Sequence, residues 1–149
     1  MSTRCAIARK AEDGTIRAMY CHHDGDIGYV GAILNASYAT TERIKALLAL
    51  GDISGLGKYL SKEDAAGTFY GTYDVCRVYA RDGGEELRPN SIYQTREEYQ
   101  QTAPKEMDAE YLYLFEGGKW EVYPVYWKTP PRWYDLAALL EKMKGEAEE

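Results

Sequence analysis

Residues 110–127 read EYLYLFEGGKWEVYPVYW, and this stretch decides the fold. Apolar and aromatic side chains alternate on both sides of Gly117-Gly118, which is typical of two strands joined by a two-residue turn. In the first strand Tyr111 and Phe115 share one face, and the leucines between them share the other. Both faces are therefore apolar. We expect this hairpin to be central and covered on both sides, or to present one face to a partner.

Working outward, the N-terminal third shows the same alternation before it changes to helical spacing. Residues 4–9 and 15–22 flank a turn signal at Gly14 and predict a second hairpin. Apolar residues then recur at helical intervals over 29–38 and 40–51, which predicts two helices.

The middle and the end of the chain predict further elements. Residues 75–81 alternate, which predicts a strand with Arg77, Tyr79 and Arg81 on one face. Thr95 begins a short helix that ends before Pro104. The run Thr129-Pro130-Pro131 starts a final helix. The apolar stripe of that helix consists of Trp133, Leu136, Leu140 and Met143.

These elements together predict a single α+β domain over residues 1–144, followed by an acidic C-terminal tail over 145–149. In that domain, helices pack on an antiparallel sheet of about five strands. A chain of 149 residues fits one domain with one core.

The composition limits the classes of partner. The net charge of −6 argues against an extended nucleic-acid interface, because phosphate contacts need clustered lysines and arginines. No apolar run follows the start of the chain, and none is long enough to cross a membrane, so we expect a cytoplasmic protein. The three cysteines, Cys5, Cys21 and Cys76, are expected to be buried reduced thiols.

The fourteen tyrosines are the unusual feature of the composition. They are explained either by sheet-forming tendency or by a surface or pocket on which a ligand stacks. The sequence contains neither a P-loop nor a GxSxG motif. No cofactor or resident metal is expected.

The first candidate site is the run Tyr20-Cys21-His22-His23-Asp24-Gly25-Asp26, which contains both histidines of the chain. A carboxylate beside an imidazole suits hydrogen bonding to a ligand or acid–base chemistry, and a metal site would require the loop to curl. The structural alternative is an Asp-Gly turn that leads into a helix. From this run we select Tyr20, His22, His23, Asp24 and Asp26 as ligand-binding residues.

The second candidate site lies at the end of the predicted strand 75–81 and in the Gly83-Gly84 loop after it. An arginine there could hold a phosphate or a carboxylate. The structural alternative is an arginine–aspartate pair on a solvated loop. The ligand-binding residues selected from this site are Arg77, Tyr79, Arg81 and Glu85.

Four segments carry a resemblance: Met1-Ser2-Thr3-Arg4, residues 20–25 (YCHHDG), residues 49–57 (ALGDISGLG) and residues 81–85. The chain resembles a functionally uncharacterised family of small proteins from bacteriophages, prophages and plasmids. The resemblance implies an origin on a mobile element rather than a reaction. His23 stands where the family tends to have an aromatic residue, and Asp26-Ile27 where it tends to have Tyr-Pro.

That origin leads to three hypotheses. The first is a phage-encoded antagonist of host defence that binds a nucleotide-derived immune signal without cleaving it, in a concave pocket lined by tyrosines and one or two arginines, in a homo-oligomer. The second is a protein that inhibits a host defence complex through an exposed aromatic patch. The third is a metal- or histidine-dependent phosphoester hydrolase. The first is preferred.

Overall fold

The structure is a computed structural model that describes residues 2–128 and 132–148. In the described residues the strands are β1 (Cys5–Lys10), β2 (Ile16–Cys21), β3 (Ile53–Gly55), β4 (Arg77–Val78), β5 (Ser91–Tyr93), β6 (Tyr111–Glu116), β7 (Lys119–Pro124) and β8 (Tyr134–Asp135). The α-helices are α1 (Ala32–Ser37), α2 (Thr41–Ala49), α3 (Tyr79–Gly83), α4 (Arg96–Glu106) and α5 (Leu136–Glu148). A π-helical turn, η1 (Ile27–Gly31), precedes α1, and a 3-10 turn, η2 (Thr72–Asp74), precedes β4.

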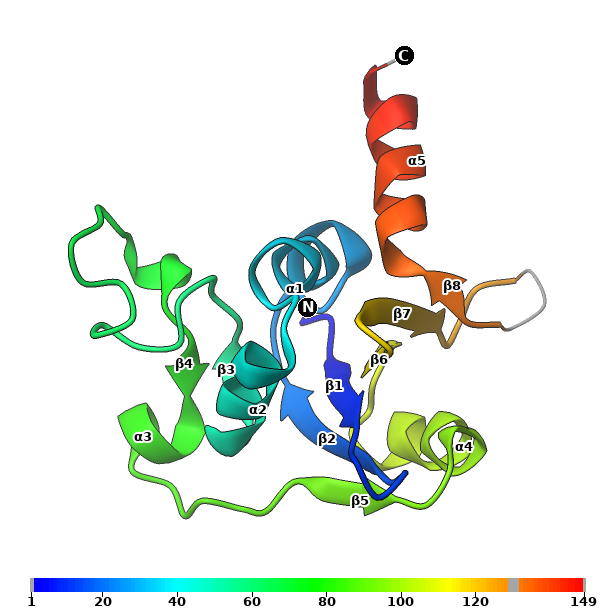
Figure 1. Cartoon of the computed structure of the whole chain (residues 1–149), viewed down its shortest axis with the longest axis horizontal. Coiled ribbons are helices and arrows are strands. Elements are labelled where there is room, and N and C mark those ends of the chain that lie inside the picture. The colour runs from blue at the N-terminus through cyan, green and yellow to red at the C-terminus, as the bar shows by residue number, and fades with distance from the viewer. Residues whose placement is uncertain (1, 129–131, 149) are drawn as a thin grey trace.

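All described strands belong to one sheet in the order β4-β3-β2-β1-β6-β7-β8, and β5 lies along β2 (Figure 1). The expected α+β class is confirmed, but the sheet has eight strands rather than about five. It is mostly antiparallel, with parallel pairs β1–β6 and β2–β3. The extra strands β3, β5 and β8 have two or three residues each, which is too short for a visible alternation of side chains.

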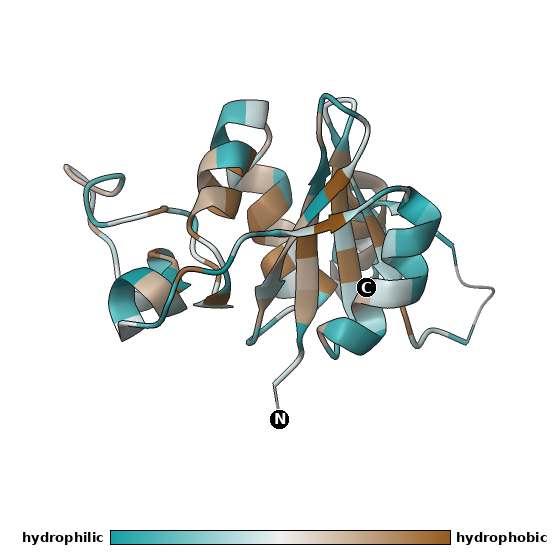
Figure 2. Ribbon diagram, turned by 90° about the horizontal axis from the view of Figure 1, so that it is seen from below, coloured by the Kyte–Doolittle hydropathy of each residue, from teal (hydrophilic) through white to brown (hydrophobic). Residues whose placement is uncertain are grey.

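The two predicted hairpins form the centre of this sheet. Cys5 to Lys10 pair with Ile16 to Cys21, and Tyr111 to Glu116 pair with Lys119 to Pro124. The two hairpins meet through parallel pairing of β1 with β6. Apolar residues are concentrated on these central strands, and the helices carry polar residues on their outer sides (Figure 2). Both faces of the hairpin are therefore covered within one chain as far as Pro124, whereas Tyr126 and Trp127, beyond the end of β7, are exposed.

Each face of the sheet has its own core. Leu112 and Leu114 of β6 face α4 and pack with Tyr99, whereas Tyr113 and Phe115 face the layer that contains η1, α1, α2 and α5. Most side chains of β1 and β2 that face α4 are small, which allows the helix to approach the sheet closely. The small ones are Ala6, Ala8 and Ala18, and Ile16 at the start of β2 is the larger residue of this set.

Several tyrosines are structural parts of these cores. Tyr38, Tyr99 and Tyr113 are fully buried. Their hydroxyls donate hydrogen bonds to main-chain carbonyl oxygens: Tyr38 to Gly57 at 2.7 Å, Tyr99 to Tyr113 at 2.9 Å, and Tyr113 to Gly25 at 2.7 Å. A buried phenol needs such a partner. Burial in the cores therefore accounts for part of the tyrosine content, although of these three only Tyr113 lies in a strand.

Two predicted elements differ from the structure. The strand expected over 75–81 ends at Val78, and the chain turns into α3, where the Asp82 carboxylate accepts the Val78 N–H at 2.9 Å. The helix begun by Thr95 does not end before Pro104 but includes it. The proline lies in the last turn, where only one helical hydrogen bond is lost, so α4 continues to Glu106.

The last helix also differs in how it starts. Thr129-Pro130-Pro131, expected to start it, lies outside the described residues. Within them, β8 leads directly into α5, and the Asp135 carboxylate accepts the Ala138 N–H at 3.0 Å. The helix continues to Glu148, through part of the segment predicted as a tail. In the described part of the chain, no helix has the length and apolar character needed to cross a membrane.

Candidate functional site

The His-Asp-Gly run follows β2 and pairs with β3 beyond the end of the strand. The main-chain N–H groups of His22 and His23 donate to the carbonyl oxygens of Ile53 at 3.1 Å and Ser54 at 2.9 Å. The His22 Nδ1 atom lies 2.6 Å from the Tyr20 hydroxyl, and the His23 Nδ1 atom lies 2.8 Å from the Ser2 hydroxyl. The two imidazoles therefore have separate partners.

The turn at Asp24-Gly25 exists because the chain passes directly against β1. A side chain at Gly25 would place its Cβ 2.7 Å from the Cys5 Cβ and 2.9 Å from the Thr3 carbonyl oxygen. Asp24 adopts a φ of 58°, a conformation that aspartate tolerates better than most residues. The close approach supports the structural alternative for this run.

The described residues of the run do not form a metal site. Among residues 2–128 and 132–148, no group of three or more histidine, cysteine, aspartate or glutamate side chains could hold a metal ion. Desolvation lowers the pKa of His22, and the positive potentials of His23 and Arg4 lower it further. His22 is therefore mostly neutral at pH 7. Asp24 and Asp26 are exposed.

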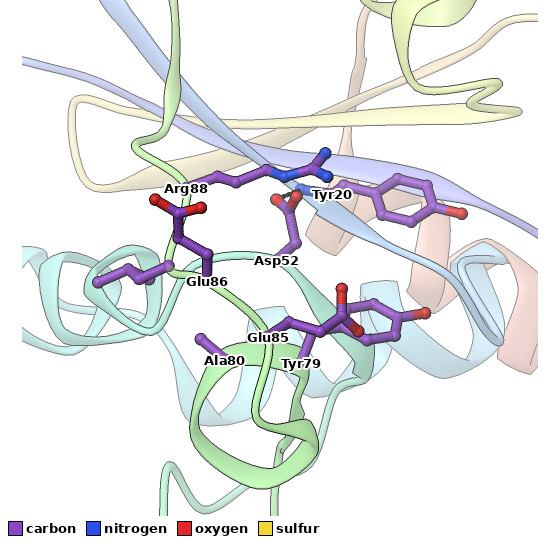
Figure 3. Close-up of a pocket in the computed structure, with 8 residues that line it drawn as sticks. Tyr20, Asp52, Tyr79, Ala80, Glu85, Glu86 and Arg88 are labelled. Carbon is purple, nitrogen blue, oxygen red and sulfur yellow. Dashed lines mark hydrogen bonds between the residues drawn. The ribbon is translucent and has the colours of Figure 1, made fainter.

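Tyr20 lines a small cleft together with residues that lie far from it in the sequence (Figure 3). We call it the Tyr20–Tyr79 cleft, and its volume is about 210 Å³. Its lining residues are Tyr20, Asp52, Tyr79, Ala80, Glu85, Glu86, Leu87 and Arg88. An adjoining hollow of about 530 Å³ shares Tyr20, Asp52 and Arg88 and adds the acidic residues Glu106 and Asp108.

Acidic groups dominate the Tyr20–Tyr79 cleft. It contains three carboxylates, Asp52, Glu85 and Glu86, and one guanidinium, that of Arg88. Arg88 extends toward Asp52 and Tyr20 (Figure 3). Desolvation raises the pKa of both lining tyrosines above the ordinary value, so these phenols stay neutral at pH 7. A phosphate would meet excess negative charge here.

A larger cleft of about 640 Å³ lies on the other side of α3, against the loop that projects from the body between β3 and β4 (Figure 1). We call it the Arg77 cleft, and we call residues 58–76 the projecting loop. The lining residues of the cleft are Ser61, Lys62, Glu63, Tyr70, Gly71, Thr72, Val75, Cys76, Arg77, Arg81 and Asp82.

The projecting loop is held firmly at its base. Tyr59 pairs with both sides of Val75, through Tyr59 N–H to the Asp74 carbonyl and Cys76 N–H to the Tyr59 carbonyl, each at 2.9 Å. Arg43 of α2 contacts Asp64 at 2.9 Å. The base of the loop is thus a fixed wall for the cleft.

Arg81 ties α3 to this loop. Its guanidinium donates to the carbonyl oxygens of Leu60 and Cys76, each at 2.7 Å, and contacts Asp82 at 2.9 Å. The structural alternative for this residue, an arginine–aspartate pair, is thus present. The hydrogen bond from Arg81 lowers the pKa of Asp82. Most donors of Arg81 are occupied by its own chain.

The Arg77 guanidinium makes fewer hydrogen bonds than that of Arg81 within the described residues. Its guanidinium carbon lies 4.8 Å from the centroid of the Tyr73 ring. Within the described residues its one hydrogen bond is from Nη1 to the Val75 carbonyl oxygen at 3.2 Å. The side chain lies against Gly55, where any Cβ would collide with the guanidinium. Arg77 is therefore positioned by a ring and a glycine while most of its donors remain available.

The cysteines have no role that the geometry reveals. Cys5, Cys21 and Cys76 are free and buried, as expected from the sequence. Burial raises the pKa of Cys76, the one thiol that lines the Arg77 cleft. A protonated thiol is a poor nucleophile.

The selected ligand-binding residues are divided between these places. Tyr20, Tyr79 and Glu85 line the acidic cleft, and Arg77 and Arg81 line the larger one. His22 contacts Tyr20, whereas His23, Asp24 and Asp26 lie exposed on the loop after β2.

Sequence reasoning missed several lining residues, among them Asp52, Lys62, Glu63, Tyr70 and Arg88. The signal for Lys62 and Tyr70 was the segment 59–72, where glycines interrupt a run that also carries aromatic residues. Such a segment is typical of an exposed loop, and loops often carry binding residues.

Comparison with known proteins adds no relative to this picture. No protein-family model, no curated protein and no solved structure matches the chain. The candidate site therefore rests on the geometry described above.

Proposed function

We propose that this protein binds a nucleotide-derived immune signal in the Arg77 cleft and sequesters it without cleaving it. In this proposal it is a phage-encoded antagonist of defence that acts in the host cytoplasm. The phage origin is supported by the resemblance of its sequence motifs. The observation that supports the binding is a cleft of about 640 Å³ in which Lys62 and Arg77 lie with Tyr70.

Size and chemistry of the cleft favour this ligand. Small-molecule sites have volumes of about 300–1,000 Å³ and combine apolar walls with a few directed polar groups. An available guanidinium binds two phosphate oxygens at once, and a tyrosine offers a face on which a base stacks. The smaller acidic cleft offers two tyrosines, Tyr20 and Tyr79, but surrounds them with carboxylates.

Binding without cleavage is favoured by what lines the cleft. Both histidines of the chain lie elsewhere, at the end of β2. The hydroxyl side chains of Ser61 and Thr72 lie at the cleft without an imidazole among its lining residues. Histidine is the side chain that most often serves as the general base at neutral pH.

The test is a thermal-shift screen against cyclic, linear and ADP-ribose-type nucleotides, with mass spectrometry of each mixture. A ligand at a hundred times its dissociation constant adds about 2.7 kcal/mol to the free energy of unfolding, which raises the melting temperature measurably. We expect a shift with the nucleotide recovered unchanged. Recovery of a cleaved product would support a hydrolase instead.

Two matched variants locate the site. Arg77→Ala should weaken nucleotide binding at least about tenfold, because a charge-assisted bidentate contact is lost. Arg88→Ala removes the guanidinium of the acidic cleft and should leave binding unchanged. If Arg88→Ala abolished binding and Arg77→Ala did not, the proposed location would be wrong.

A second candidate function is inhibition of a host defence protein by direct contact. Phe69 at the tip of the projecting loop is fully exposed, and Tyr73 is largely exposed. An aromatic side chain on a loop with a fixed base is typical of a binding hot spot. In this case Phe69→Ala would abolish inhibition in infected cells while the purified protein bound nucleotides normally.

A further inference from the structure

The charged groups on the wall of the Arg77 cleft limit the charge of its ligand. The cations are Lys62, Arg77 and Arg81, and the carboxylates are Glu63 and Asp82. Asp82 forms a close pair with Arg81, at 2.9 Å, so these two charges compensate each other. Glu63 offsets one of the two remaining cations. One positive charge is left uncompensated.

Two further carboxylates lie on the projecting loop and are not among the lining residues. Asp64 is compensated by Arg43, at 2.9 Å. Asp74 accepts the N–H of Gly71 at 2.9 Å and keeps its negative charge, so the surplus of one positive charge is that of the lining residues alone. A ligand with one negative charge matches the wall, whereas each further charge would be held without a counterpart.

The geometry of Arg77 indicates which anionic group this is. Its guanidinium lies over the Tyr73 ring with Nε and Nη2 against Gly55, and within the described residues its one hydrogen bond is from Nη1, so N–H donors remain for the oxygens of an anionic group. A phosphodiester presents two such oxygens and carries one charge. A terminal phosphomonoester carries about −1.5 to −2 charges at pH 7.

The wall also has room for one planar ring. Tyr70 lines the cleft with about two fifths of its surface exposed. Val75 and Cys76 supply apolar surface beside it. Of the described lining residues Tyr70 is the one aromatic side chain, so the wall offers one stacking position rather than two.

We infer that the ligand of the Arg77 cleft is a nucleoside phosphodiester with a single charge and a single base, the class of cyclic mononucleotides. This inference rests on the proposed function. Arg77 and Lys62 hold the phosphodiester, Tyr70 stacks with the base, and Glu63 disfavours ligands of higher charge.

Isothermal titration calorimetry of the full chain tests this assignment. The probes are the 3′,5′-cyclic monophosphates of adenosine, guanosine, cytidine and uridine, the matching 5′-monophosphates and diphosphates, and a cyclic dinucleotide, all at one salt concentration. We expect at least one cyclic monophosphate to bind about tenfold or more tightly than its monophosphate, its diphosphate and the dinucleotide.

The matched variant is Glu63→Gln, which removes one exposed carboxylate and keeps the shape of the side chain. It should improve binding of the diphosphate relative to the cyclic monophosphate by about two- to fivefold, the effect of one solvated charge. Tyr70→Ala should weaken cyclic monophosphate binding about tenfold, the effect of one lost stacking contact.

The outcomes separate the two proposals. Tighter binding of a diphosphate or of the dinucleotide would overturn the single-charge inference and leave the proposed function intact, provided that Arg77→Ala weakens it. An unchanged preference in Glu63→Gln would also overturn the inference. If no nucleotide bound at all, both the proposed function and the inference would be wrong.

Discussion

The two clefts on either side of α3 are built from similar side chains and differ in charge. Each contains at least one tyrosine, at least one arginine and at least two carboxylates. In the Tyr20–Tyr79 cleft the carboxylates outnumber the single arginine. In the Arg77 cleft the cations outnumber the carboxylates, and one carboxylate is neutralised by Arg81. Charge balance, rather than aromatic content, distinguishes the cleft that suits a phosphate.

The separation of the clefts depends on where one strand ends. Strand periodicity would place Arg77, Tyr79 and Arg81 on one face. In the structure the strand ends at Val78, and the helical turn directs Tyr79 to the acidic cleft while Arg81 reaches the projecting loop. Tyr79 and Arg81, two residues apart in the sequence, therefore lie in clefts of different charge.

The largest expected difference between the clefts is in how much stability the protein loses when one lining residue is replaced by alanine. Arg81→Ala should lower the free energy of unfolding by about 2 kcal/mol, because the carbonyl groups of Leu60 and Cys76 and the carboxylate of Asp82 lose a charged donor. Glu85→Ala, in the other cleft, should change it by less than about 0.5 kcal/mol. Urea denaturation measures both. Equal effects would remove the structural role assigned to Arg81.

A smaller effect on the free energy of unfolding should appear at acidic pH, and it comes from Asp82 at the Arg77 cleft. The hydrogen bond from Arg81 lowers the pKa of Asp82 from 3.8, so the folded state favours the carboxylate. Its stabilisation is present above pH 3.8 and is lost as the pH falls through the lower, folded-state pKa. We expect the stability difference between the parent protein and Asp82→Asn to be constant from pH 7 to 5.

Below pH 4 that difference should shrink, which denaturation at a series of pH values would show. A difference that persisted unchanged to pH 2 would contradict the ion pair. Asp24→Asn, on the exposed loop after β2, is the control variant for the loss of one surface carboxylate.

The smallest expected effect is a change in stability near pH 6.5, caused by His22 beside the Tyr20–Tyr79 cleft. Desolvation lowers the pKa of His22 from 6.5, so the unfolded chain binds the proton more readily than the folded protein does. Stability should therefore decrease slightly as the pH falls from 6.5 through the folded-state pKa. His22→Gln should flatten this part of the profile, and His23→Gln is the comparison for the neighbouring imidazole.

Elements with strong local sequence signals were predicted correctly. The hairpins around Gly14 and Gly117-Gly118 and the helices begun by Thr40 and Thr95 were predicted and are present. Their signals are local: alternation over several residues, positive-φ glycines in turns, and threonines that cap helices. The short strands β3, β5 and β8 carry no comparable signal.

The candidate site was predicted only in part. Tyr20, Tyr79 and Glu85 do meet in one cleft, although they were selected from two separate runs. Contact with Thr3 accounts for the exposed positions of Asp24 and Asp26. Contacts with Leu60 and Cys76 account for the internal hydrogen bonds of Arg81. No local sequence pattern around those residues predicts such long-range contacts.

The sequence by itself determined the α+β class, the two central hairpins and the burial of apolar residues on both faces of the 110–127 hairpin, because these depend on side-chain periodicity within short segments. Only the tertiary structure decided that β1 pairs in parallel with β6 and that Tyr79 and Arg77 belong to different clefts. Strand partnership and local charge depend on groups that are distant in the chain, and their sum is defined only when the fold brings them together.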